Sequence, residues 1–113
     1  ESSLFERYRE RLVISPTAIP SILDPRDRMF DVLINGTTLV PGILQADLDA
    51  IGTRDTYDDE YFGALFAVNR RVLERRLNES IAMTAAMIAG AWEAAGRPGV
   101  PTVPTALPVQ RRR

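Results

Sequence analysis

The pattern that most constrains this chain is an unbroken run of helical periodicity in its second half. No proline occurs between residues 57 and 95, and apolar side chains return every three or four positions. They are Phe62, Leu65, Phe66, Val72, Leu73, Leu77, Ile81, Ile88 and Trp92. Gly96 then offers a left-handed helix cap, and Pro98 prevents continuation. The pattern predicts one helix over about residues 57–95, roughly 55 Å long at about 1.5 Å per residue.

A helix of that length is longer than every other element that the sequence predicts. We therefore expect a missing upstream domain or other protein subunits to lie along the 57–95 helix. Ala82, Ala86 and Gly90 stand four residues apart, a spacing that lets another helix approach closely. Because Glu93 lies beside this row, we interpret the row as tight packing in a soluble bundle rather than a membrane motif. We favour a partner from outside the chain for this row as well.

A second helix is expected over about residues 25–51. Asp24 can cap its first free amides, and Pro25 suits the first helical position. One face holds Phe30, Leu33, Val40, Leu44, Leu48 and Ile51. Gly52 ends the helix. An Asn-Gly pair and Pro41 weaken its middle, so we predict a kink or a break between residues 35 and 42.

The remaining segments complete an all-α fold class without a sheet. A short amphipathic helix is expected over about residues 2–12, followed by a proline-containing extended stretch. We expect residues 1–96 to form a helical module in which the long C-terminal helix packs on the kinked helix. Because the 57–95 helix is longer than its neighbours, we expect this module to be an incomplete domain within a larger helical bundle. The start at Glu1 rather than Met indicates a mature form or a fragment. Residues 97–113 should form an extended tail rich in proline and arginine.

The composition excludes most catalytic side chains. The chain has no His and no Cys, and all fourteen of its basic residues are Arg. It therefore lacks an imidazole for proton transfer, a thiolate nucleophile and a Schiff-base lysine. Four arginines lie within residues 97–113, so the rest of the chain is acidic, which is not the charge pattern of a nucleic-acid binder. No stretch reaches the roughly 18 apolar residues of a membrane span.

Two charged clusters have a functional and a structural interpretation. Asp55, Asp58, Asp59 and Glu60 carry the oxygen ligands that hard cations prefer. Acidic residues are also favoured at a helix N-terminus, and Thr56-x-x-Asp59 resembles a capping box. We favour helix capping for this cluster.

The second cluster consists of Arg70, Arg71, Arg75 and Arg76, which could bind phosphates. Glu74 follows Arg70 by four residues and Glu79 follows Arg75 by four, so surface ion pairs are the favoured interpretation. Asn78 heads a glycosylation sequon in the middle of the predicted helix, and we do not expect it to be modified.

Three stretches of this sequence carry a family resemblance. They are Tyr57-Asp-Asp-Glu-Tyr-Phe, Leu73-Glu-Arg-Arg-Leu-Asn-Glu-Ser-Ile and Gly90-Ala-Trp-Glu-Ala-Ala-Gly-Arg-Pro. Together they resemble the C-terminal helix of bacterial members of the superfamily of zinc-dependent phospholipase C and zinc-dependent single-strand nucleases. Phe5-Glu-Arg-Tyr-Arg and Asp24-Pro-Arg-Asp resemble the segments before that helix.

This resemblance implies an all-helical protein that holds three zinc ions and hydrolyses phosphodiesters, in the periplasm or secreted. Glu1 would be the last residue of a His-x-x-x-Glu metal-ligand pair whose His lies outside this chain. We expect no catalytic residue and no cofactor in this chain, with zinc held by the complete parent protein. The expected function is a non-catalytic C-terminal helical scaffold of a zinc-dependent phosphodiester hydrolase. The alternative is a structural or interaction subunit of a larger assembly without enzymatic activity.

Overall fold

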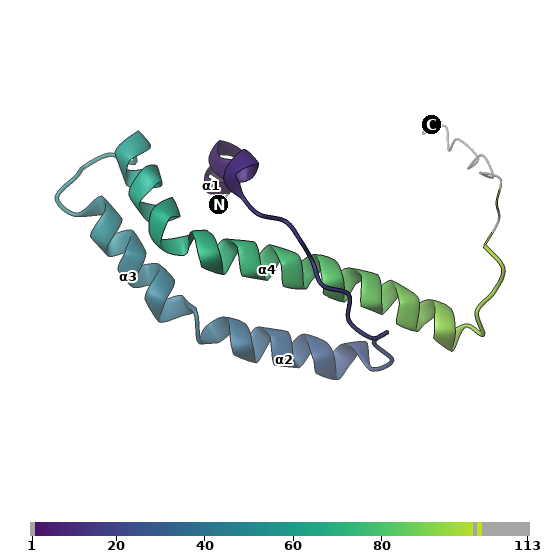
Figure 1. The fold of residues 1–113 in the computed structure, drawn as a ribbon. Helices are drawn as coiled ribbons and strands as arrows, with labels where there is room; N and C mark the ends of the chain where they lie inside the picture. The colour runs from purple at the N-terminus through teal and green to yellow at the C-terminus, as the bar shows by residue number, and fades with distance from the viewer. Residues whose placement is uncertain (1, 101, 103–113) are drawn as a thin grey trace, which may run out of the picture.

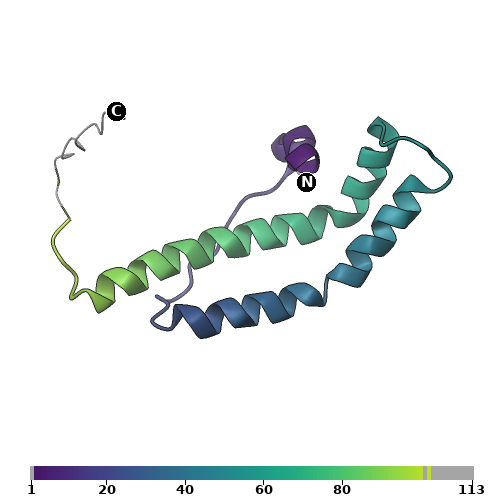
Figure 2. The same cartoon turned by 180° about the vertical axis from the view of Figure 1, so that it is seen from behind.

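The computed structural model describes residues 2–100 and 102. Its elements are α1 (Ser2–Tyr8), the 3-10 helix η1 (Arg9–Arg11), α2 (Pro25–Thr37), α3 (Val40–Ile51) and α4 (Asp59–Ala94). No strand occurs among those residues, so the predicted all-α fold class is confirmed. Figure 1 shows α4 running the length of the molecule, with α2 and α3 following along one side. In Figure 2 the extended segment after α1 crosses behind α4.

The bounds of α4 follow from its two caps. The Asp58 carboxylate accepts a hydrogen bond from the Tyr61 amide at 2.9 Å, so Asp58 is the N-cap. The predicted capping box that starts at Thr56 is therefore wrong, because Asp58 brings both an extended backbone and a carboxylate to the helix start. At the other end Gly96 adopts a φ of 81°, and the Arg97 amide donates to the Trp92 carbonyl at 2.9 Å. The predicted stop at Gly96 is confirmed.

The predicted break in the second helix is also confirmed, since α2 ends at Thr37 and α3 begins at Val40. The Thr37 hydroxyl donates to the Ile34 carbonyl at 2.6 Å. The Thr38 hydroxyl donates to the Asn35 carbonyl at 2.7 Å. These side chains satisfy carbonyls at the end of α2, while a proline occupies the first turn of α3, where its missing amide costs nothing.

The core lies mainly between α3 and α4, which form a hairpin around Gly52 (Figure 1). Gly52 has a φ of 51°, a left-handed value that favours glycine at the turn. The buried apolar residues are Ala46, Ala50, Tyr61, Phe66 and Ala86. The Tyr61 hydroxyl donates to the Asp47 carboxylate at 2.5 Å and joins the two helices. This hydrogen bond, together with burial, raises the pKa of Tyr61 to about 12.

The N-terminal helix lies on the first half of α4. The Tyr8 ring stacks on Phe66 with ring centroids 4.2 Å apart. The Arg7 guanidinium lies 4.4 Å from the centre of the Phe62 ring and forms an ion pair with Asp59. A helix of seven residues has little stability alone, so these contacts hold α1 in place.

Residues 13–22, which we name the strap, cross α4 in an extended conformation. The Val13 amide donates to the Glu74 carboxylate at 2.9 Å. The Asn78 side chain accepts from the Ser15 amide at 2.6 Å and donates to the Val13 carbonyl at 3.0 Å. Residues 74 and 78 are one helical turn apart, so one ridge of α4 binds the strap through two successive side chains.

The small-residue row of α4 packs against the far end of the strap. The Ile22 amide donates to the Ala86 carbonyl at 3.0 Å. A Cβ atom built on Gly90 would lie 1.9 Å from the Ile22 carbonyl oxygen. The expectation that a helix from outside the chain meets this row is therefore wrong at Ala86 and Gly90. The close approach is made by an extended segment of the same chain, since only a residue without a side chain leaves room for its backbone.

The molecule is elongated. Its radius of gyration is 19.5 Å, whereas a compact domain of this size has about 13 Å. Its principal extents are 58 by 38 by 29 Å. The predicted tail from residue 97 lies largely outside the described residues, and the Pro98 carbonyl accepts a hydrogen bond from the Trp92 indole at 2.8 Å.

The strap should loosen in acid. The Arg70 guanidinium and the Val13 amide hold the pKa of Glu74 below its ordinary value of 4.5. A lowered folded-state pKa stabilises the fold above the ordinary value, and this stabilisation is lost as the pH falls through the folded-state pKa. We expect the NMR shift of the Val13 amide to titrate with Glu74, and Glu74→Gln to remove that titration. A Val13 amide shift that stays constant from pH 6 to pH 3 would contradict this assignment.

Candidate functional site

Three residues of the acidic cluster stabilise the start of α4. Asp58 caps α4, Asp59 pairs with Arg7, and Glu60 pairs with Arg54. The Arg54 guanidinium donates a hydrogen bond to Glu60, and this bond raises the pKa of Arg54. The interpretation as helix capping is thus confirmed for Asp58, and its neighbours form ion pairs that join the α4 start to α1 and to the preceding turn.

The donor set of this chain does not fit a zinc site. Zinc in proteins is bound mostly by His and Cys, and the sequence contains neither. No group of three potential metal-ligating side chains occurs within residues 2–100 and 102. Glu1, the one predicted ligand, lies outside the described residues. We therefore derive no chemistry through zinc from this chain.

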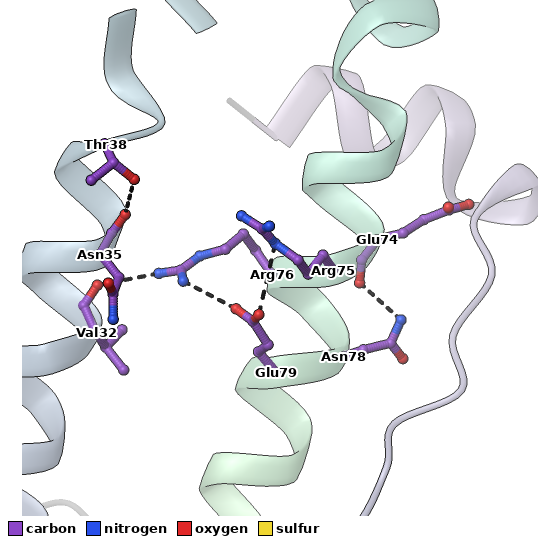
Figure 3. Close-up of polar contacts among 8 residues, drawn as sticks. All are labelled: Val32, Asn35, Thr38, Glu74, Arg75, Arg76, Asn78 and Glu79. Carbon is purple, nitrogen blue, oxygen red and sulfur yellow. Dashed lines mark hydrogen bonds and ion pairs between the residues drawn. The ribbon is translucent and has the colours of Figure 1, made fainter. Parts of the chain in front are cut away.

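Arg70, Arg75 and Arg76 of the arginine cluster on α4 form ion pairs with neighbouring carboxylates. Arg70 lies 2.8 Å from Glu74, and Arg75 lies 3.7 Å from Glu79. Glu79 also forms an ion pair with Arg76, 3.1 Å away, as the close-up in Figure 3 illustrates. The interpretation as i to i+4 surface pairs is confirmed for Arg70 and Arg75, and such pairs contribute only a few tenths of a kcal/mol each.

A cleft of about 730 Å³ separates α2 from α4. Arg76 spans it and donates to the Val32 carbonyl of α2 at 3.5 Å (Figure 3). The lining has charges of both signs, with Arg28 and Asp31 on the α2 side. The cleft therefore presents no single charge to a ligand. It also leaves α2 without a buried residue, so most of the surface of this helix is open.

An exposed row of large apolar side chains lies on α2 and α3. We name it the outer stripe. It consists of Phe30, Leu33, Ile34, Val40, Leu44 and Leu48, whose exposed fractions run from 48% to 64%. These residues follow one another at spacings typical of one helix face, apart from the break between α2 and α3. A stripe of this kind is unusual on a solvent-facing surface, because contiguous apolar patches on soluble proteins mark binding sites.

Helix geometry places the outer stripe away from α4. Residues two positions apart lie about 200° apart around a helix. Ala46 and Ala50 are buried in the hairpin with α4, so Leu44 and Leu48 lie on the opposite side of α3. On α2, Val32 lines the cleft toward α4, which places Phe30 on the far side in the same way. On α3 the small side chains thus face α4 and the large ones face outward.

Sequence reasoning found five of the six stripe residues and missed Ile34. It also missed the role of Asn78, whose side-chain amide binds the strap. The periodicity of the sequence indicated the stripe. No local pattern indicated the role of Asn78, because Val13 and Ser15 lie 65 and 63 residues before it in the chain.

No family model, no curated protein and no solved structure matches this chain. The resemblance to the zinc-dependent phospholipase C and nuclease superfamily therefore stays a prediction. Across the part of the chain that the structure describes, every helix is too short or too polar to cross a membrane.

Proposed function

We propose that this chain is a non-catalytic helical scaffold that docks another protein on its outer stripe. The observation that carries the proposal is the exposure of this stripe, where Leu44 is 58% exposed and Leu48 is 61% exposed. Fully burying one such side chain contributes about 1.5–3 kcal/mol. Because these side chains are 48–64% exposed, about half of that gain remains for each, and six together supply free energy of the same order as the cost of association.

The hairpin of α3 and α4 gives this surface a fixed backing. Ala46 and Ala50 pack into α4, and the hydrogen bond from Tyr61 to Asp47 locks the two helices together. A docking surface on rigid elements loses little conformational freedom when a partner binds. The stripe on α3 is therefore preorganised, whereas α2 depends on its partner for burial because its inner side meets only the cleft.

Cysteine labelling in cells tests this proposal. The chain contains no cysteine, so Leu44→Cys creates a single reactive site. We expect this thiol to react readily with a maleimide in the isolated chain. In intact cells of the organism that makes the protein, we expect labelling to be slower by about tenfold or more, equivalent to about 1.4 kcal/mol of protection.

Ile88→Cys is the matched control, because this side chain is 67% exposed on α4 and lies outside the stripe. Its labelling should be equally fast in both settings. Equal labelling of Leu44→Cys in cells and in isolation would contradict the proposal. The zinc-dependent hydrolase that the resemblance implies is one identity for the docked protein, and elemental analysis of the native assembly for zinc tests that identity.

A further inference from the structure

Over α3 the flanks of the outer stripe carry negative charge, whereas on α2 Arg26 lies one turn before Phe30 and pairs with Asp27. Between residues 29 and 53 the sequence contains Asp31, Asp47 and Asp49 but no basic residue. Neighbouring residues lie about 100° apart around a helix, so Asp47 and Asp49 lie on the two sides of Leu48. The Asp49 side chain is exposed, and Gln45 donates a hydrogen bond to it at 2.8 Å. The apolar surface of α3 is thus bordered by carboxylates on both sides.

This border selects among the possible occupants of the stripe. Two copies that met stripe to stripe would bring carboxylates against carboxylates, and like charges across an interface disfavour association. A membrane surface with anionic lipids would be repelled for the same reason. An apolar ridge flanked by basic side chains would instead place opposite charges along both borders, which favours association and its rate.

The shape of the stripe favours a helix as its occupant. Its residues follow the three- and four-residue spacings that form the ridges of a helix, and such ridges pack into the grooves of another helix. From Phe30 to Leu48 the stripe spans about 27 Å of helix, the length of an occupant of about 18 residues.

We propose that the outer stripe binds an amphipathic helix of another protein whose apolar face is flanked by Arg or Lys. This inference rests on the proposed function and adds the chemistry of the partner. The apolar contacts supply most of the affinity, while the carboxylates at Asp47 and Asp49 set the preference for a basic partner.

Two synthetic peptides of about 18 residues test the inference with the full chain. Both carry the same leucine face, and the flanking positions are lysine in one peptide and glutamate in the other. Binding is measured by fluorescence anisotropy. At low salt we expect the lysine peptide to bind at least about tenfold more tightly than the glutamate peptide. This ratio should shrink in about 0.5 M salt, because screening weakens exposed charge pairs.

Variants assign the binding to the stripe. The double variant Leu44→Ser and Leu48→Ser should lose most of the affinity for the lysine peptide while its circular dichroism stays helical. Asp49→Asn should reduce the preference for lysine. Ile88→Ser is the control, because Ile88 is 67% exposed on α4 outside the stripe, and it should leave both affinities unchanged.

Three outcomes would overturn the inference. The first is equal affinity for the two peptides, and the second is failure of both to bind. The third is self-association of the chain, seen by sedimentation and lost in the double serine variant, which would assign the stripe to a second copy. Each outcome is separable from the proposed function, since protection of Leu44→Cys in cells does not depend on the charge of the partner.

Discussion

Replacing Gly90 with alanine should destabilise the chain, although alanine is the better helix former. A Cβ at this position would lie 1.9 Å from the Ile22 carbonyl oxygen and 2.6 Å from its carbonyl carbon. The strap would have to move, with loss of the hydrogen bond from the Ile22 amide to Ala86. Overpacking costs about 1–3 kcal/mol, and the lost bond adds about 1 kcal/mol. The gain in helix propensity, about 1 kcal/mol, offsets only part of this.

Gly63→Ala in the same helix is the matched control. A Cβ there would meet only the Tyr8 hydroxyl oxygen, at an ordinary 3.7 Å. We expect this variant to be more stable than the parent by about 0.5–1 kcal/mol, the usual gain for alanine over glycine inside a helix. The two substitutions should therefore shift the thermal midpoint in opposite directions, measured by circular dichroism. A rise in the midpoint for Gly90→Ala would mean that the strap does not lie on this row.

Phe66→Ala should destabilise the chain even more than Gly90→Ala. Phe66 is 1% exposed, stacks on Tyr8 and lies under the Arg11 guanidinium. Truncating a buried phenylalanine costs about 3–5 kcal/mol. The total stability of a domain is only about 5–15 kcal/mol, and few large side chains are buried in this one. We expect the variant to lose cooperative unfolding and to become sensitive to trypsin at Arg9 and Arg11.

Phe30→Ala is the control for this substitution. Phe30 has the same side chain but is 58% exposed, so its truncation should change the free energy of unfolding by less than about 0.5 kcal/mol. Urea unfolding followed by circular dichroism measures both variants. Equal effects of the two truncations would contradict the burial of Phe66 between α1 and α4.

The helices could be predicted from the sequence because their signals are local. Asp24 caps α2 through the Asp27 amide, Gly52 takes the left-handed turn after α3, and Gly96 ends α4. Each of these signals acts within a few residues of the helix end that it sets. The start of α4 is harder to predict because several acidic and hydroxyl side chains precede it, and any of them could cap a helix.

The packing of the long helix on the kinked helix was predicted, but the face that packs was not, because periodicity gives a face without saying what covers it. The face with Leu44 and Leu48 has the larger side chains, yet α4 packs on the face with Ala46 and Ala50. Small side chains let two helices of a hairpin approach closely, and this left the large ones outward. Gly90 likewise indicated that another segment lies close to α4. Whether that segment is a helix or an extended stretch depends on contacts between residues far apart in the sequence, here Ile22 and Gly90.

The strap gives the chain an order of assembly during synthesis. Residues 13–22 leave the ribosome early, yet the groups that bind them, at Glu74, Asn78 and Ala86, are made about 60 residues later. Until then residues 13–22 lack these contacts on α4, while the hairpin of α3 and α4 can close through contacts nearer in sequence. Closing so long a loop carries an entropic cost that contacts of high sequence separation must repay. The strap therefore joins α4 late, and until then it is exposed to proteases and chaperones.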